Sequence, residues 1–318
     1  MVDLRGGIDL GGTKIQTAIV DRDGTVSGEA RRPTPTSGGP ADVAGAMEEA
    51  LREAAAAAAI EPKDLAGVGV GSPGDANGET GLVSSARNLP GWEGSFPLGE
   101  TLAEALGTPV RIGNDVQVAV EGEHRLGAGR PYGSFLGVWW GTGVGGGIVL
   151  DGRPWLGRGA AAEIGHIVVE RDGAICPCGR RGCMEAYAGR AAMEAEARRR
   201  HGGGEKTDLF KLMEKHGKPR LTSGIWARAL DHGDDLATQL IERAIGALGT
   251  GVASACNVLD VEAVVIGGGL GDRFGKSHID ALREELLKHL FSDADPPRIE
   301  LAALGDLGGA IGASLLVE

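Results

Sequence analysis

The chain has 318 residues, a formal net charge of −12 and a sequence pI of about 5.1. Its 42% hydrophobic content predicts a globular fold and excludes a disordered chain, and its acidic balance argues against nucleic-acid binding, which normally uses a basic face. No signal peptide is visible, and no apolar run reaches membrane-spanning length. We therefore expect a cytoplasmic protein that contacts no membrane, with its four cysteines in a reducing compartment.

The first half of the chain alternates strand and helix patterns. Apolar runs bounded by glycine or proline predict strands at residues 6–11, 14–21, 65–74 and 109–115. Helical periodicity and alanine-rich composition predict helices at residues 41–60, 97–107 and 115–127. The first two strands flank a glycine turn.

The second half restarts with a strand pair around glycines, at residues 134–143 and 144–152. Residues 184–258 are mainly helical, and later strands are predicted at residues 261–269 and 297–304, with helices at residues 275–291 and 306–316. Strands mixed with helices throughout indicate α/β layers. A strand–glycine–strand unit recurs at Gly11–Gly12 and at Gly141–Gly147, which predicts two related halves facing each other.

Two glycine-rich motifs resemble nucleotide fingerprints without their required context. Residues 141–146 read GTGVGG, but a strand pattern follows where the dinucleotide fingerprint must open a helix. Residues 267–277 read GGGLGDRFGKS, in which the first glycine of a P-loop is out of position. We reject both readings, but keep Gly267, Gly268 and Gly269 as small residues that would let a flat ligand lie against the backbone.

The segment DLGGTK, from Asp9 to Lys14, joins the first two predicted strands. Gly11 and Gly12 would free the backbone to present N–H groups to an anion, with help from the Thr13 hydroxyl and the Lys14 charge. Asp9 could hold Mg²⁺ or its bound water. An ordinary glycine hairpin remains an equal alternative. A second such turn comprises Gly141, Thr142 and Gly143, and two such turns suit a polyphosphate.

Three of the four cysteines, Cys176, Cys178 and Cys183, lie within eight residues. A disulfide would leave one odd thiol and is disfavoured in a reducing compartment, and the C-x-x-C redox pattern is absent. Three neighbouring thiolates suit a structural zinc ion, which needs four ligands. The turn glycines Gly179 and Gly182 would let the backbone fold around the ion. Cys256 lies in an apolar helix pattern and is expected in the core.

These motifs resemble the sugar kinase–actin–Hsp70 ATPase superfamily and, more narrowly, the ROK-family sugar kinases of bacterial glucokinase type. The resemblance covers nearly the whole chain and follows the family's order through DLGGTK, NLPGW, GND, GTGVGGG, AAEIGH, CPCGRRGCMEAYAG and VVIGGGLG. It implies two actin-like, ribonuclease H-like α/β domains around a central cleft. The small domain would comprise residues 1–113 and 305–318, and the large domain residues 114–304 with a zinc loop at 166–183.

The resemblance also implies roles for individual residues. Asp115 matches the family's catalytic base, although either it or Asn114 could simply cap the following helix. His166 matches the fourth zinc ligand. The positions that match sugar contacts are Gly74, Asn88, Asn114, Asp115, Glu163, His166 and Glu185. Glu121 and Glu123 are expected on a solvated helix face.

The implied activity is ATP-dependent phosphorylation of a hexose 6-hydroxyl, with glucose the expected sugar and ATP, Mg²⁺ and structural Zn²⁺ as cofactors. Family alternatives are N-acetylglucosamine, N-acetylmannosamine, mannose or fructose kinases. Gln117 and Ala162 depart from the usual pattern beside the sugar site, so they bear on sugar choice. From another class, a sugar-responsive regulator would carry a DNA-binding segment before the first strand, and a non-catalytic sugar-binding protein would not need Asp9 and Asp115. A homodimer or homotetramer is expected.

Overall fold

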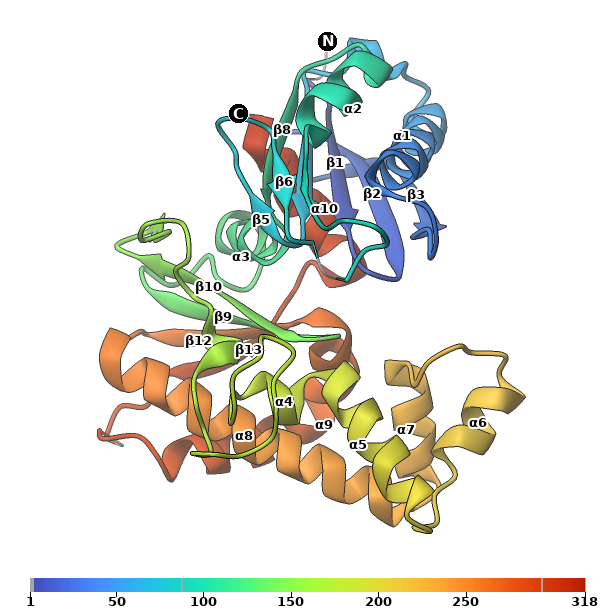
Figure 1. Cartoon of the computed structure of the whole chain (residues 1–318). Helices are drawn as coiled ribbons and strands as arrows, with labels where there is room; N and C mark the ends of the chain where they lie inside the picture. Colours follow the sequence, from blue (N-terminus) through green and yellow to red (C-terminus); the bar gives the residue numbers. More distant parts are fainter. Residues whose placement is uncertain (1–2, 87, 293, 318) are drawn as a thin grey trace. The chain divides into compact units, whose positions relative to one another are not determined.

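The computed structural model describes residues 3–86, 88–292 and 294–317. The chain forms two compact units (Figure 1). Unit 1 comprises Met1–Arg130 and Ala303–Glu318, and unit 2 comprises Pro131–Ala302. The chain therefore first passes from unit 1 to unit 2 after residue 130, whereas the sequence predicted the end of the first domain segment at residue 113. The reason is that helix α3 (Asp115–Leu126) packs against helix α10 (Gly308–Ser314) within unit 1.

Unit 1 is built on a five-stranded sheet in the order β3-β2-β1-β4-β8. The central strand β1 pairs antiparallel with β2 and parallel with β4, and β4 pairs parallel with β8. A separate sheet in the order β5-β6-β7 has two-residue strands. The strands are β1 (Arg5–Leu10), β2 (Lys14–Val20), β3 (Val26–Pro33), β4 (Val68–Ser72), β5 (Asp75–Ala76), β6 (Val83–Ser84), β7 (Ser95–Phe96) and β8 (Val110–Asn114).

Helices cover both faces of the unit 1 sheet. Helix α1 (Pro40–Ala57) buries Met47 and Leu51 against one face, and α2 (Leu98–Leu106) extends that core. On the other face α10 lies on β1 and β4, beside α3. This approach requires glycine, because a Cβ on Gly7 would stand 1.8 Å from the Ala310 carbonyl oxygen. The 3₁₀ turns of the unit are η1 (Pro62–Asp64), η3 (Gly305–Leu307) and η4 (Leu315–Val317).

Unit 2 repeats the same sheet plan in the order β11-β10-β9-β12-β13. Its central strand β9 again pairs antiparallel with the next strand and parallel with β12, and β12 pairs parallel with β13. The shared strand order confirms the expectation of two related halves. The strands are β9 (Phe135–Trp140), β10 (Val144–Leu150), β11 (Arg153–Pro154), β12 (Ala263–Gly267) and β13 (Arg298–Leu301).

The helices of unit 2 build its hydrophobic core. The long helix α8 lies beside α9 (Figure 1). Both helices contribute to a hydrophobic core that includes the fully buried Trp226. Side chains at Thr222 and Asp234 cap α7 and α8. The helices are α4 (Glu185–Ala188), α5 (Arg190–Gly202), α6 (Leu209–Lys215), α7 (Ser223–Asp231), α8 (Asp235–Leu259) and α9 (Gly268–Leu287), with a 3₁₀ turn η2 (Ile164–His166). None of the helices in the described ranges is long and apolar enough to cross a membrane.

Candidate active site

Two carboxylates lie at the carboxyl end of the unit 1 sheet. Asp9 on β1 is in register with Gly71 on β4, and Gly71 is in register with Gly113 on β8, two residues before Asp115. A Cβ on Gly71 would lie 3.3 Å from the Asp115 Cα, so the glycine leaves room for the carboxylate-bearing backbone. Ligand sites in open α/β sheets commonly lie at this end of parallel strands.

Both polar residues of the GND segment accept hydrogen bonds at the start of α3. Asn114 is the N-cap of α3, and its Oδ1 accepts hydrogen bonds from the N–H groups of Val116 and Gln117, both at 3.1 Å. Asp115 is the first residue of the helix, and its Oδ1 also accepts from the Val116 N–H at 2.9 Å. The side chain of Asn114 therefore accepts two N–H groups of the first turn, and that of Asp115 shares one of them.

The electrostatics of Asp9 show that the two carboxylates interact. Burial first, and then the charges of Asp115 and Asp306, raise the pKa of Asp9 to about 7, against an opposing effect of Lys14. A like charge nearby disfavours the ionised form of a carboxyl group. A divalent cation held by Asp9 would offset this repulsion, so the carboxylate pair fits the predicted Mg²⁺ site.

The DLGGTK turn is closed by a hydrogen bond from the Gly11 N–H to the Lys14 carbonyl, at 2.9 Å. The Asn88 side chain lies against it, because a Cβ on Gly12 would stand 3.0 Å from Asn88 Nδ2. Thr13 at the tip is exposed. The turn thus brings a predicted sugar contact and predicted nucleotide contacts together within unit 1. Gly74, with a φ of +85°, lies in the loop that follows β4.

Lys14 is not a free cation in this structure. Its Nζ donates a hydrogen bond to Asp306, which also accepts from Gln16 at 3.0 Å and forms an ion pair with Arg31 at 3.5 Å. Burial alone would raise the pKa of Asp306, but the hydrogen bond and charge of Lys14 and the charge of Arg31 lower it. Asp306 carries no local signal in the sequence, because only the fold brings residues 14 and 306 together.

Glu123 is not on a solvated face, and that expectation is wrong. The residue is 1% exposed, and its carboxylate accepts N–H groups from Ala128, Ala303 and Leu304 at 2.8, 2.9 and 2.9 Å. These donors belong to the two segments through which the chain leaves and re-enters unit 1. Glu123 therefore ties both segments to α3. Two of its three hydrogen-bond donors lie about 180 residues downstream, so the local sequence does not indicate that Glu123 is buried.

The second predicted turn joins β9 and β10 in unit 2. The Gly141 N–H donates to the Gly143 carbonyl at 3.0 Å, and the following residue is already in β10. Because β10 begins at Val144, inside the GTGVGG segment, no helix opens there and the segment is no dinucleotide fingerprint. The Val144 N–H donates to Glu185 Oε2 at 2.8 Å, and a Cβ on Gly143 would lie 2.2 Å from the same oxygen. Glu185 thus holds the turn.

The three glycines after β12 differ in their surroundings. Helix α9 begins at Gly268, directly after the strand, so no phosphate-wrapping loop intervenes and the P-loop reading is excluded. A Cβ on Gly267 would lie 3.0 Å from the Trp139 ring, and one on Gly268 2.8 Å from the Trp140 carbonyl oxygen. Apart from the chain neighbours of Gly269 and the backbone of α9, no atom of the described residues lies within 4 Å of a Cβ built there. Among the three, Gly269 is the one with open space for a ligand.

His166, Cys176, Cys178 and Cys183 converge, with their ligand atoms all within 4.8 Å of one another. The Sγ atoms of Cys178 and Cys183 are 3.8 Å apart, and Cys176 Sγ lies 3.7 Å from His166 Nδ1. A tetrahedral ion with Zn–S bonds of about 2.3 Å separates two thiolates by roughly 3.8 Å. All four cysteines are free thiols, and Cys256 is buried in the core, apart from the cluster.

The backbone of the cysteine loop explains how the thiols converge. The Cys176 N–H donates to the Arg180 carbonyl at 2.8 Å, and the Gly182 N–H donates to the Ala174 carbonyl at 2.8 Å, which closes a tight hairpin. Gly182 has a φ of +76°, and a Cβ there would stand 1.7 Å from the Glu170 carbonyl oxygen. No other residue type fits that position.

The thiol environments are unequal. Burial is the main cause that raises the pKa of Cys176 to about 12, and burial also raises the pKa of Cys183. The backbone N–H of Arg180 is the main cause that lowers the pKa of Cys178 to about 7. A bound cation would replace the protons that burial otherwise retains on these thiols.

His166 and Glu185 connect the cysteine cluster to its surroundings. The His166 Nδ1 faces Cys176, whereas its Nε2 lies 3.8 Å from Glu163 Oε2. Glu185 Oε1 lies 3.9 Å from Cys176 Sγ, while its other oxygen holds the glycine turn. The cluster therefore adjoins all three unit 2 residues that the sequence assigned to sugar binding.

Comparisons with known proteins agree with this architecture. The sequence profile of the ROK family matches residues 5–318. Glucokinase from Thermotoga maritima is 32% identical over 317 residues, which cover 98% of this chain and 96% of that protein. N-acetylmannosamine kinase from Haemophilus influenzae is 32% identical over 316 residues, which cover 98% and 94%.

Among solved structures, a ROK family glucokinase from Streptomyces griseus in complex with glucose and AMPPNP superimposes with a TM-score of 0.84 at 30% identity, over 98% of both chains. The similarity extends over nearly the whole length, and the mixed α/β architecture agrees with it. The chain belongs to the ROK family.

Proposed function

We propose that the protein is an ATP-dependent glucokinase that transfers the γ-phosphoryl group to the 6-hydroxyl of glucose. The observation that carries this proposal is Asp115, which stands at the carboxyl end of β8 while Asn114 caps the helix. The supporting context is the full-length similarity to glucokinases, including one solved with glucose and an ATP analogue.

In the proposed reaction, Asp115 acts as the general base. Its carboxylate accepts the proton of the sugar hydroxyl as that oxygen bonds to the γ-phosphorus and the bond to the leaving ADP oxygen breaks. Because phosphoryl transfer depends mainly on positioning and charge, the base contributes about 10²- to 10⁴-fold. The residues proposed to hold the sugar are Gly74, Asn88, Asn114, Asp115, Glu163, His166 and Glu185.

The residues proposed to bind ATP, the phosphate donor, lie in the two glycine turns and at the start of α9. Backbone N–H groups and a threonine hydroxyl in each turn suit phosphate oxygens. Asp9 would hold Mg²⁺, which supplies charge neutralisation at the transferring phosphate when it is bound. The residues are Asp9, Gly11, Gly12, Thr13, Lys14, Gly141, Thr142, Gly143 and Gly269, with Gly267 and Gly268 shaping the backbone behind them.

We assign a structural zinc ion to His166, Cys176, Cys178 and Cys183. Four protein ligands leave no open position for a reacting water, so the ion would orient residues and not react. His166 would bind through Nδ1 and keep Nε2 beside Glu163. Free thiol ligands suit a reducing cytoplasm, in which we place the protein. We propose that it forms a homodimer or homotetramer.

A coupled ADP-release assay across a hexose panel tests the function. With ATP and Mg²⁺, we expect glucose to give the highest kcat/KM among glucose, N-acetylglucosamine, N-acetylmannosamine, mannose and fructose. A preference for N-acetylmannosamine would favour the second candidate, which rests on the 32% identical N-acetylmannosamine kinase. Absence of turnover with every sugar would reject a kinase function.

A further inference from the structure

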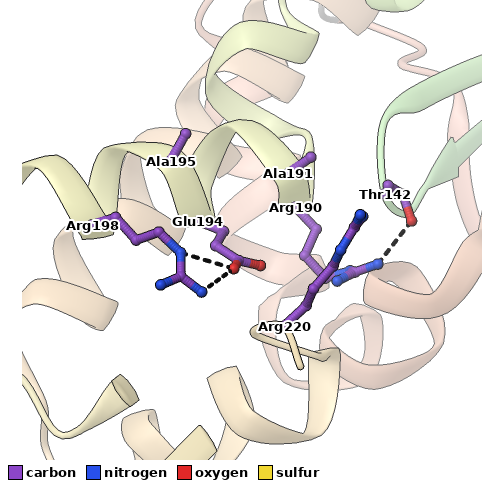
Figure 2. Close-up of a pocket in the computed structure, with 7 residues that line it drawn as sticks. All are labelled: Thr142, Arg190, Ala191, Glu194, Ala195, Arg198 and Arg220. Carbon is purple, nitrogen blue, oxygen red and sulfur yellow. Dashed lines mark hydrogen bonds and ion pairs between the residues drawn. The ribbon is translucent and has the colours of Figure 1, made fainter. Parts of the chain in front are cut away.

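A pocket of about 230 Å³ in unit 2 is rich in arginine (Figure 2). Three guanidinium groups and one carboxylate line it, so its side chains carry a net positive charge. At about 30 Å³ per water molecule, the volume holds several waters or one phosphate group. The lining residues are Thr142, Arg190, Ala191, Glu194, Ala195, Arg198 and Arg220.

One of these arginines is already neutralised. The Arg198 Nε and Nη2 donate to Glu194 Oε1 at 3.1 and 2.6 Å, an i,i+4 pair on α5. The other oxygen of Glu194 accepts the Leu221 N–H at 3.0 Å. Both oxygens of the only carboxylate in the lining are thus engaged, and the positive charge that remains belongs to Arg190 and Arg220.

Arg190 donates only to neutral acceptors among the described residues. Its Nη2 donates to Thr142 Oγ1 at 2.8 Å, and its Nη1 donates to the Leu221 carbonyl at 3.1 Å. Burial is the main cause that lowers the pKa of this guanidinium, and the charge of Arg220 lowers it further, against the charge of Glu194. A desolvated cation beside a second cation gains from an anion between them.

Arg220 is exposed and forms no hydrogen bond or ion pair with any residue that the structure describes. Figure 2 shows its side chain beside that of Arg190, on the same side of the pocket as Thr142. Its guanidinium is therefore free to turn toward a ligand without breaking an existing contact.

The pocket adjoins the proposed phosphate-binding turn. The N–H groups of Arg190 and Ala191 donate to the carbonyls of Gly141 and Thr142 at 3.1 and 3.0 Å, which anchors the start of α5 on the turn. Because Thr142 Oγ1 accepts from Arg190, its own hydroxyl proton stays available for an anionic oxygen. Arginine is suited to phosphate because its planar fork donates two parallel hydrogen bonds.

We propose that Arg190 and Arg220 bind a phosphate group of the nucleotide donor next to Thr142. This inference rests on the proposed kinase function and adds two donor-binding residues to it. Arg190 also positions the turn through the Thr142 hydroxyl, whereas Arg220 acts only on the ligand.

Calorimetric titration of the full chain with ATP, ADP and inorganic phosphate tests the proposal. Arg190→Gln is expected to raise the Kd for ATP at least tenfold, and Arg220→Gln three- to tenfold. Arg198→Gln is the matched control from the same pocket, and its Kd should stay within twofold because Glu194 already neutralises Arg198. In steady-state assays, KM for ATP should rise in the first two variants while KM for the sugar stays unchanged.

Arg220→Gln keeps the test decisive if Arg190→Gln loosens the turn, because Arg220 makes no contact that folding needs. Wild-type affinity for ATP in folded Arg220→Gln and Arg190→Gln would overturn the proposal. Weakened phosphate binding with unchanged ATP binding would also overturn it, and would instead indicate a separate anion site. If the wild type binds ATP through these arginines but phosphorylates no sugar, the proposed function fails while this inference stands.

Discussion

At the scale of single residues, Asp9 combines burial with a neighbouring carboxylate. Its pKa is raised from 3.8 to about 7 by burial and by Asp115, so between these pH values the folded chain holds a proton that the unfolded chain has lost. Folded-state stability therefore falls as pH rises from about 4 to about 7. The upper bound of this loss is about 4 kcal/mol, and the partial solvent exposure of the side chain reduces it.

We expect Asp9→Asn to flatten this pH dependence and to make the metal-free chain more stable than wild type at pH 8. Urea unfolding at pH 5, 6, 7 and 8 in the presence of EDTA measures the effect. Asp231→Asn, at an exposed position, is the control and should keep the wild-type slope. Equal slopes for wild type and Asp9→Asn would show that Asp9 ionises normally.

At the scale of elements, Glu123 fastens α3 to the two segments that join the units. Glu123→Ala leaves three N–H groups without their acceptor, at about 1–3 kcal/mol each. We expect the free energy of unfolding of Glu123→Ala to fall by at least about 3 kcal/mol. Glu123→Gln keeps one oxygen, so its stability should lie between those of the wild type and Glu123→Ala.

Chemical denaturation measures these losses. Glu121→Ala, on the same helix, is the matched control, because the structure gives Glu121 a contact with His124 at 3.5 Å and no backbone N–H. A Glu123→Ala loss no larger than that of Glu121→Ala would contradict the role assigned to Glu123.

The cysteine loop is the second element with a sharp prediction. Elemental analysis of purified wild type should find one zinc per chain, and Cys178→Ser should lose it while Cys256→Ala retains it, because Cys256 lies in the core away from the cluster. Loss of zinc should raise the KM for the sugar, since the loop holds His166 and adjoins Glu185. A zinc-free preparation with full sugar affinity would refute the structural role.

At the scale of the whole molecule, periodicity and glycine placement predicted the central strands and most helices. Strand β3 was not predicted, because its sequence, VSGEARRP, lacks alternating apolar residues. Its pairing with β2 stabilises the strand despite this weak local propensity. The two-residue strands β5 to β7 carry too short a pattern to be recognised.

The candidate site shows the same division between local and distant information. Asp9, Asp115 and the three clustered cysteines lie in short motifs, so the sequence alone was sufficient to name them as candidates. Other contacts form only because the chain returns to unit 1 at its C-terminal end. They are the pair of Lys14 with Asp306 and the pair of Glu123 with Ala303. Arg190 follows the glycine that ends α4, but nothing local indicates that its guanidinium reaches Thr142.

The proposed function depends above all on Asp115, as the base in phosphorylation of glucose by ATP. The most direct measurement compares kcat of wild type and Asp115→Asn with glucose, ATP and Mg²⁺, with glucose 6-phosphate identified as the product. We predict that kcat falls by about 10²- to 10⁴-fold. The melting temperature and ATP affinity should stay unchanged, because Asn114 still caps α3. Near-wild-type turnover by Asp115→Asn would contradict this role of Asp115.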